Sequence, residues 1–164
     1  MSKIRIFGKG GFAREWEHHM CEPCDLVDSR EAEPNDTRQS YIAIGDPHTR
    51  EAVYNANKEK CITYPMICPG AQITVNVQFG LCVIVNLNAT IGHDCVIGDF
   101  VTISPGANIS GNVLIGNRCY IGTQAAIVEG VAICGDVILG AGAVVVEDIT
   151  EPGTYVGVPA KRIK

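Results

Sequence analysis

Apolar residues recur at every sixth position along the second half of the chain. From Ile67 to Thr150 the 84 residues divide into 14 hexads without insertion, beginning ICPGAQ, ITVNVQ, FGLCVI, VNLNAT and IGHDCV. The first residue of each hexad is Ile, Leu, Val or Phe, and the fifth is Ala, Val, Cys or Ile. An amphipathic helix repeats its apolar residues about every 3.6 positions and a half-buried strand alternates. The strict period of six fits neither element.

This period predicts short strands separated by bends, with three hexads forming one triangular coil of 18 residues. Successive coils would stack at the spacing between paired strands, about 4.8 Å. One coil cannot bury its apolar face alone, so the stack supplies the core. Large first residues would fill the prism, and small fifth residues its corners. The glycines, many of them at the second position or in bends, would supply the unusual backbone angles of the corners.

The sixth residues of hexads one coil apart form columns on the outside of the prism, and two columns are apolar. One column holds Val96, Leu114 and Ala132, and the other holds Ile84, Tyr120 and Ile138. Exposed apolar stripes usually mark an interface. We therefore expect self-association, as a homotrimer with the prisms side by side.

Residues 1–66 follow a different pattern. A strand over 3–7 leads into Gly8-Lys9-Gly10-Gly11 and a helix over 12–20. Strands over 24–28 and 41–44 follow, and then a helix over 47–58. This order is typical of a small Rossmann-like α/β layer. The Gly-rich turn at a helix N-terminus could hold a phosphate, or it could be a plain tight turn, and the segment is too short for a complete dinucleotide-binding fold.

Composition narrows the choice of partners. The chain carries 18 acidic and 13 basic side chains, and its formal net charge of −5 argues against nucleic acid and membrane surfaces. The start MSKIRIFGKGG lacks the apolar run of a signal peptide, so we expect a cytoplasmic protein without disulfides. Cys21 and Cys24 form a lone CxxC with no second pair, and no metal site is predicted.

His93 is the histidine of the repeat region and the candidate catalytic base. It occupies the third position of IGHDCV, which faces outward from a rigid scaffold. Imidazole accepts a proton near neutral pH. The carboxylate of the adjacent Asp94 could fix the tautomer of His93 or raise its basicity.

Gly111 follows His93 by 18 residues and so lies one coil further in the same column. A glycine there leaves the main-chain N–H accessible to a developing oxyanion, although Gly111 could instead serve the bend. A base beside an oxyanion donor is the minimum apparatus for acyl transfer. Cys95 and Cys119 occupy inward-facing fifth positions, and no Ser/His/Asp arrangement is evident, so the pattern favours direct transfer over an acyl-enzyme.

The run NLNATIGHDCVIGDFVTISPGANISGNVLIG, with GAGAVV and the ending YVGVPAKRIK, resembles the bacterial sugar O-acyltransferase family of the sialic-acid O-acetyltransferase type. It is similar also to the nucleotide-linked 4-amino-sugar N-acetyltransferases. IFGKGGFAREW, CDLVDS and YIAIGDPHTR extend the resemblance to nearly the whole chain. The resemblance implies a left-handed parallel β-helix over 67–150. A small sugar-nucleotide-binding domain over 1–66 would precede it, and a tail over 151–164 that caps coenzyme A would follow.

The resemblance also implies a homotrimer with acetyl-CoA in the groove between adjacent prisms. In that family the residue matching His93 is the general base, the one matching Asp94 enhances it, and the amide matching Gly111 receives the thioester oxygen. Asn86 would lie close to the reacting groups. The positions that would line the acetyl-CoA groove are Thr102, Thr123, Ala141, Gly157 and Lys161. The positions that would hold the sugar nucleotide are Gly10, Gly11, Phe12, Asp28, Ser29 and Gly45.

The predicted function is acetyl-CoA-dependent N-acetylation of a nucleotide-linked amino sugar, with His93 as general base. The alternatives are O-acetylation of a sialic-acid-type sugar, acetylation of an amino acid or antibiotic on the same scaffold, and a hexapeptide-repeat binding or assembly module without catalysis. A γ-type carbonic anhydrase would need three zinc-binding histidines on the coils, and the repeat contains only His93.

Overall fold

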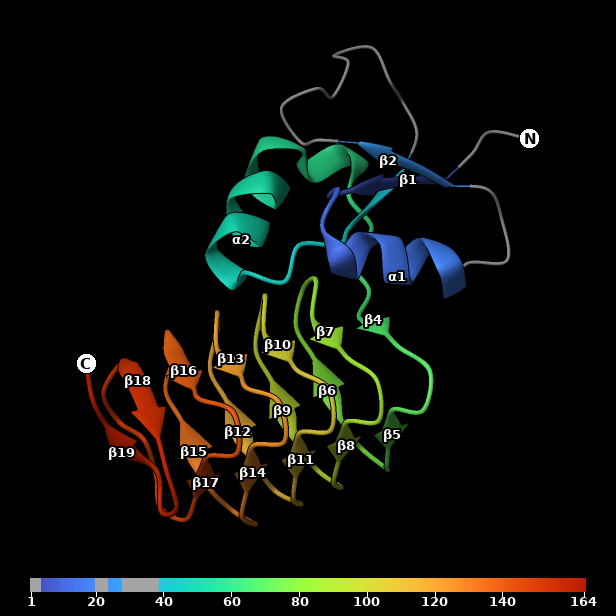
Figure 1. Ribbon diagram of the computed structural model, residues 1–164. Coiled ribbons are helices and arrows are strands. Elements are labelled where there is room, and N and C mark those ends of the chain that lie inside the picture. The colour runs from blue at the N-terminus through green and yellow to red at the C-terminus, as the bar shows by residue number, and fades with distance from the viewer. Residues whose placement is uncertain (1–3, 20–23, 28–38) are drawn as a thin grey trace. The chain divides into compact units, whose positions relative to one another are not determined.

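The computed structural model describes residues 4–19, 24–27 and 39–164, and the chain divides into two compact units, Met1–Thr63 and Tyr64–Lys164. In the N-terminal unit, β1 (Ile4–Phe7) lies between β2 (Cys24–Val27) and β3 (Ser40–Ile42) in a parallel sheet. Helix α1 (Gly11–His19) follows β1, and α2 (Pro47–Ala56) follows β3 (Figure 1). A single 3-10 turn (Lys58–Lys60) comes after α2. These elements occur in the order that the sequence predicts.

Helix α2 begins where its sequence favours a helix start. The Asp46 side chain is the N-cap and accepts a hydrogen bond from the Thr49 N–H at 2.7 Å. Pro47 occupies the first turn, where its fixed φ suits the helix and its missing N–H costs nothing. The cap leaves the preceding Gly45 in the connection from β3 to α2.

The second unit is a prism of short strands (Figure 1). From β5 to β15, and again at β17, each strand consists of the sixth residue of one hexad and the first of the next. The strands are β4 (Met66–Ile67), β5 (Gln72–Ile73), β6 (Gln78–Phe79), β7 (Ile84–Val85), β8 (Thr90–Ile91), β9 (Val96–Ile97), β10 (Thr102–Ile103), β11 (Asn108–Ile109), β12 (Leu114–Ile115), β13 (Tyr120–Ile121), β14 (Ala126–Ile127), β15 (Ala132–Ile133), β16 (Val137–Leu139), β17 (Val144–Val145), β18 (Gly153–Val156) and β19 (Lys161–Arg162).

Every third strand joins the same sheet, so three sheets form the sides of the prism. Their orders are β19-β18-β16-β13-β10-β7-β4, β17-β14-β11-β8-β5 and β15-β12-β9-β6. From β4 to β17, paired residues are 18 apart and the strands are parallel, as Thr102 shows by pairing with Ile84 on one side and Tyr120 on the other. The predicted triangular coil of 18 residues is confirmed by this register. We call the sheets the seven-, five- and four-stranded sheets.

The first and fifth residues of the hexads form the core. From Val83 to Ile149, all residues at these two positions are buried in one continuous cluster. Burying an Ile or Val side chain contributes roughly 1.5–3 kcal/mol. The strict repeat therefore yields a stiff rod whose outward positions are free to carry chemistry.

The unusual backbone angles fall at the fourth position of the hexads, which is glycine at four places, and not at the second-position glycines that were also expected to supply them. Asn76, Asp94, Asn112 and the other fourth residues from Gly70 to Gly142 have φ between 51° and 77°, whether or not they are glycine. The second-position glycines serve a different need, because the coils stack directly on them. A Cβ on Gly98 would lie 2.8 Å from the backbone N of Asn117 in the next coil.

The last coil extends into the C-terminal residues. Strand β18 pairs in parallel with β16, and β19 turns back to pair antiparallel with β18. Residues 153–156 and 161–162 thus continue the seven-stranded sheet. The Val158–Pro159 peptide bond in the connecting turn is cis.

Candidate active site

His93 and Asp94 lie at the bend between the five-stranded and four-stranded sheets, directly after β8. The same bend in successive coils holds residues 75–76, 93–94, 111–112, 129–130 and 147–148, which we call the His93 edge. The Asp94 residue has φ 58°, and this sharp turn brings two consecutive side chains to the same side. The sequence alone did not settle that orientation.

The two side chains form a close pair. His93 Nδ1 lies 2.8 Å from Asp94 Oδ2, and both side chains are about half exposed. The other carboxylate oxygen, Oδ1, accepts a hydrogen bond from Asn76 Nδ2 at 3.0 Å. These bonds, with the Asn76 bond as the largest cause, lower the pKa of Asp94. An ionised carboxylate only accepts, so in the neutral imidazole the proton is on Nδ1 and the lone pair is on Nε2.

The ring of His93 lies against Gly111. A Cβ on Gly111 would be 2.5 Å from His93 Nε2 and 2.6 Å from Cε1. Within the described residues, the Gly111 N–H donates no hydrogen bond, while its carbonyl accepts from the Gly130 N–H at 3.0 Å. Below it, Gly92 has no side chain to cover this nitrogen, since a Cβ there would be 2.5 Å away. A base and an unused amide donor therefore lie side by side.

Cys95, two residues after His93, does not supply a nucleophile. Its Sγ lies within the buried core and 3.1 Å from the carbonyl oxygen of Ser110. Burial raises the pKa of the Cys95 thiol. The protonated thiol is a poor nucleophile, which agrees with direct acyl transfer.

Four predicted site residues lie away from the His93 edge of the same chain. Thr123 and Ala141 lie at the bends between the seven-stranded and five-stranded sheets, one coil apart. Asn86 lies at the start of the same turn, two coils before Thr123 and three before Ala141. It is buried and donates from Nδ2 to the Ile103 carbonyl at 3.0 Å. Thr102 is buried on β10 of the seven-stranded sheet. One copy of the prism does not bring these residues to His93.

Lys161, by contrast, reaches the His93 edge. Its Nζ lies 3.1 Å from Oε1 of Glu147, and Glu147 occupies the His93 column three coils further on. Three coil spacings correspond to about 14 Å. Gly157, in the same C-terminal segment, has φ 93° and accepts from the Val144 N–H at 3.0 Å. Lys161 thus places a positive charge at the end of the His93 edge that holds Glu147, three coils from His93.

In the N-terminal unit, the sheet order brings Gly10, Gly11 and Gly45 to one edge. Gly10 and Gly11 follow β1, Gly45 follows β3, and these strands are neighbours that run in parallel. The loop at Gly45 is held by Arg50, whose buried guanidinium donates from Nη1 to the carbonyls of Ile44 and Gly45.

The remaining predicted contacts of the sugar nucleotide lie wholly or partly outside the residues that the structure describes. Asp28 and Ser29 lie outside the described residues, and Phe12 lies in α1 with its side chain outside them.

Among residues 4–19, 24–27 and 39–164, no three His, Cys, Asp or Glu side chains gather closely enough to hold a metal ion. No helix in these described parts of the chain is long and apolar enough to cross a membrane.

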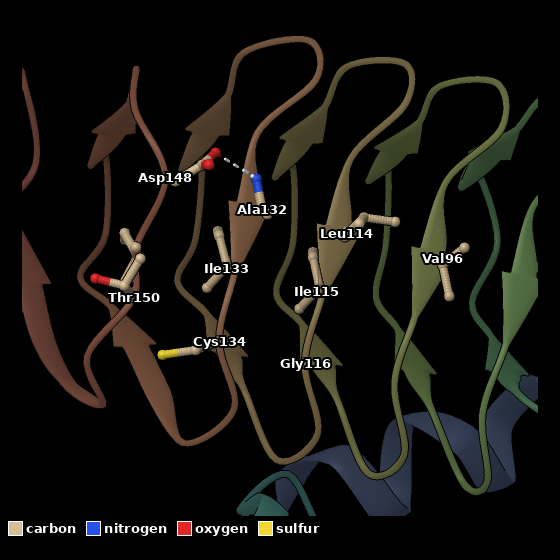
Figure 2. A pocket seen from close by; sticks show the side chains of 10 residues that line it. Val96, Leu114, Ile115, Gly116, Ala132, Ile133, Cys134, Asp148 and Thr150 are labelled. Carbon is tan, nitrogen blue, oxygen red and sulfur yellow. Dashed lines mark hydrogen bonds between the residues drawn. The ribbon is translucent and has the colours of Figure 1, made fainter.

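The four-stranded sheet adjoins the His93 edge and carries an apolar outer face. Leu114 pairs with Val96 and with Ala132, so the predicted column is confirmed, and Val96 and Leu114 are 40% and 49% exposed. Figure 2 shows the hollow that this column lines, with Asp148 and Thr150 at one end of the lining. Asp148 is tied down, since it accepts from the Ala132 N–H at 2.8 Å. In the second predicted column Ile138 is exposed and Ile84 is buried.

Two residues near His93 were missed in the sequence, Asn76 and Gly92. Asn76 precedes Asp94 by 18 residues. The spacing that links His93 to Gly111 in the next coil therefore also links Asp94 to Asn76 in the preceding coil. Gly92 belongs to the second-position glycines, whose role in coil stacking the repeat alone did not reveal.

No protein-family model matches the chain. Solved structures do match over nearly its whole length. PerB from Caulobacter crescentus, solved with CoA and GDP-perosamine, is 27% identical, with a TM-score of 0.80 over 100% of this chain and 98% of that one. A variant of perosamine N-acetyltransferase from the same organism, also with CoA and GDP-perosamine, is 25% identical, with a TM-score of 0.78 and the same coverage.

The acetyltransferase domain of PglB from Neisseria gonorrhoeae FA1090 is 26% identical, with a TM-score of 0.84 over 98% of this chain and 99% of that one. That domain has also been solved with acetyl coenzyme A. The resemblance to sugar acyltransferases that the motifs indicated is confirmed by these structures, which are sugar N-acetyltransferases and their close structural relatives.

Proposed function

We propose that this chain is an acetyl-CoA-dependent acetyltransferase that N-acetylates a nucleotide-linked amino sugar. The observation that carries the proposal is the arrangement of His93, with Nδ1 on the Asp94 carboxylate and the ring against Gly111. The matching structures with CoA, acetyl-CoA and GDP-perosamine support the two substrates.

The chemistry follows from this arrangement. The sugar amine attacks the thioester carbonyl and forms the C–N bond, while His93 Nε2 takes the proton from the nitrogen. The Gly111 N–H donates to the oxyanion of the tetrahedral intermediate. The intermediate collapses, the C–S bond breaks, and the CoA thiolate receives the proton back from His93. Asp94 stabilises the imidazolium that exists between the two transfers.

The coenzyme would lie along the His93 edge, with its acetyl group at His93 and its nucleotide end near Lys161. Glu147 already holds Lys161 at that end. Gly157 would contribute backbone in the same segment. Thr123 and Ala141 would line the groove from a neighbouring copy, because in one chain they lie at another edge. Thr102, on the seven-stranded sheet, would belong to the same copy. Asn86 would approach the reacting groups in the same way.

This placement requires an oligomer, and we propose a homotrimer of left-handed prisms. The apolar column of Val96, Leu114 and Ala132 adjoins the His93 edge, so a second copy packed there would close one side of the groove (Figure 2). Burying that column would remove exposed apolar surface that water disfavours.

The N-terminal unit would hold the sugar nucleotide in a Rossmann-like manner. Ligands of open parallel sheets bind outside the carboxyl ends of the strands, where the chain order reverses. In the order β2-β1-β3 that point lies between β1 and β3. Gly10 and Gly11 offer main-chain N–H groups at the start of α1, and Gly45 faces the same edge. Phe12, Asp28 and Ser29 complete the proposed contacts.

The experiment is a thiol-release assay with acetyl-CoA and a panel of nucleotide-linked amino sugars, free amino sugars and sialic acids. The proposal expects CoA release with an amino-sugar nucleotide. Release with a sialic acid alone would mean O-acetylation instead. Bound acetyl-CoA without release across the panel would contradict a sugar acceptor, and the absence of acetyl-CoA binding would contradict the enzyme itself.

A further inference from the structure

The carboxylate of Asp94 is held from two sides. One oxygen, Oδ2, contacts His93 Nδ1 at 2.8 Å, and the other, Oδ1, accepts from Asn76 Nδ2 at 3.0 Å. Asn76 comes from the preceding coil, 18 residues earlier, and does not itself adjoin the reacting atoms. A chain of three side chains, Asn76, Asp94 and His93, therefore ends at the imidazole.

The backbone fixes the geometry of this chain. Asn76 and Asp94 occupy the same fourth position in hexads one coil apart, with φ 57° and 58°. The Asp94 N–H donates to the Val75 carbonyl at 3.0 Å and ties the two bends together. The distance between the amide and the carboxylate is thus set by coil stacking and not by a mobile loop.

Other asparagines at fourth positions are engaged differently. Asn112, one coil beyond Asp94, donates to Glu129 Oε1 at 3.4 Å. The Asn88 side chain lies over Gly70 at another edge of the prism, with φ 56°. A structural need for asparagine at these bends therefore does not by itself explain the bond from Asn76 to Asp94.

We propose that Asn76 is a positioning residue for the acetyl transfer, which holds the Asp94 carboxylate in the orientation that fixes His93. The inference rests on the proposed function. A carboxylate without a second partner rotates toward water, and the Nδ1–H of His93 then loses its acceptor. With Asn76 in place, Oδ2 stays on Nδ1, and the lone pair of Nε2 faces the acceptor.

The test is Asn76→Gly, because glycine keeps the positive φ that alanine would strain. We expect kcat to fall roughly three- to tenfold, the size of one hydrogen bond, with KM for acetyl-CoA unchanged. Asn88→Gly removes the same side chain from an equivalent bend and is the matched control. Asn76→Asp, which replaces the donor by a second carboxylate of the same size, should be at least as defective.

A second measurement separates this role from a structural one. The Asp94 carboxyl carbon is titrated by ¹³C NMR in the wild type and both glycine variants. The titratable groups that interact with Asp94 among the described residues are His93 and the Cys95 thiol. The midpoint should rise toward the ordinary carboxyl value in Asn76→Gly and stay in place in Asn88→Gly.

An unchanged midpoint and kcat in Asn76→Gly, or equal changes in Asn88→Gly, would overturn the inference. The titration needs no substrate, so it reads the link between Asn76 and Asp94 even if the wild type transfers no acetyl group. A failure of the proposed function and a failure of this inference are therefore distinguishable.

Discussion

At the scale of single residues, the candidate site is defined by what lies one coil above and below His93. The third position of the His93 edge carries a side chain at Val75, Glu129 and Glu147, and is glycine at Gly111, where the imidazole lies. The absence of a side chain at Gly111 therefore leaves room for the His93 ring beside the Gly111 amide. Gly111 has no unusual φ that would require glycine for the bend.

Gly111→Ala should impair catalysis without unfolding the prism. The added Cβ would lie 2.5 Å from His93 Nε2, so the ring must move away from the amide donor. We expect kcat to fall at least tenfold, toward the roughly 10²–10³ seen when an oxyanion donor is lost. Steady-state kinetics measure the loss, and circular dichroism checks the fold.

A double variant sharpens this prediction. If Gly111→Ala acts by displacing the ring, then adding it to His93→Ala should have little further effect, because residues that act as a unit are not additive. Fully additive losses would mean that the two residues act independently.

Much of this site could be predicted from the sequence because an 18-residue coil converts spacing into contact. Gly111 was found in that way from His93, which is the histidine of the repeat and has Asp94 next to it. Asn76 obeys the same rule, but its role depends on side-chain direction at a bend with positive φ, which spacing does not encode. The roles of Asn86, Thr102, Thr123 and Ala141 came from family resemblance and stay predictions.

At the scale of the elements, the period of six predicted the strands and the core because apolar residues occupy the first and fifth positions without exception, and these positions are buried from Val83 to Ile149. Glycines in the bends do supply unusual backbone angles, as expected, but those at the second position do not, and there is a physical reason. The sequence shows that glycine is favoured at the second position. Glycine is favoured both where the backbone takes an unusual φ and where another part of the backbone packs closely against it. Only the stacked coils distinguish the two, as the contact of Gly98 with Asn117 shows.

Gly98→Ala should destabilise the prism. Its Cβ would lie 2.8 Å from the Asn117 backbone N and 2.9 Å from the Gly116 carbonyl carbon, which cannot move without separating the coils. We expect a loss of about 1–3 kcal/mol, the usual cost of overpacking. Urea unfolding at fixed protein concentration measures it. Val128→Ala, at a second position with a half-exposed side chain, is the control and should change stability less.

In the N-terminal unit, Asp46→Ala should loosen the start of α2. Loss of an N-cap costs about 0.5–2 kcal/mol. The side-chain hydrogen bond with Thr49 is the largest cause that lowers the pKa of Asp46. Because the pKa of Asp46 is lower in the folded than in the unfolded chain, its ionised carboxylate stabilises the fold when the pH is above the unfolded-state pKa, about 3.9. This contribution disappears as the pH falls through the folded-state pKa.

The measurement is hydrogen exchange of the α2 amides at several pH values. The difference between wild type and Asp46→Ala should be full at pH 6 and shrink below about pH 4. Asp46→Asn keeps a capping oxygen but cannot ionise, so its protection should vary less with pH. A constant difference down to pH 3 would contradict the role assigned to the ionised carboxylate.

At the scale of the whole molecule, the proposed active site needs two copies of the chain. His93 and Lys161 lie along one edge, while Thr123 and Ala141 lie at another. The exposed Val96 and Leu114 next to the His93 edge offer the surface through which a second copy would pack.

Mixing two inactive variants tests this arrangement. His93→Ala removes the base, and Ala141→Trp would block the groove on the opposite edge. When the two variants are unfolded and refolded together in equal amounts, they should recover about one quarter of the wild-type rate. In the mixed trimers, one half of the sites have an intact His93, and one half of those also have an intact Ala141 from the neighbouring copy. Recovery near zero would mean that both residues serve one site within a single chain.

Leu114→Glu gives an independent reading of the same surface. A charge in the buried interface should shift the mass in sedimentation equilibrium from three copies to one and reduce activity with it. Ile163→Glu, an exposed apolar position outside that face, is the control. A trimer that survives Leu114→Glu unchanged would place the interface elsewhere.

The most direct test of the central claim follows the acetyl group itself. The protein is incubated with acetyl-CoA labelled with ¹³C at the carbonyl and with a GDP-linked 4-amino sugar, and the product is examined by NMR. We predict a labelled amide on the sugar nitrogen with the wild type, and with His93→Ala a rate lower by roughly 10²–10⁴ while acetyl-CoA still binds. Equal transfer by His93→Ala, or no labelled amide from a wild-type protein that binds both substrates, would contradict the account.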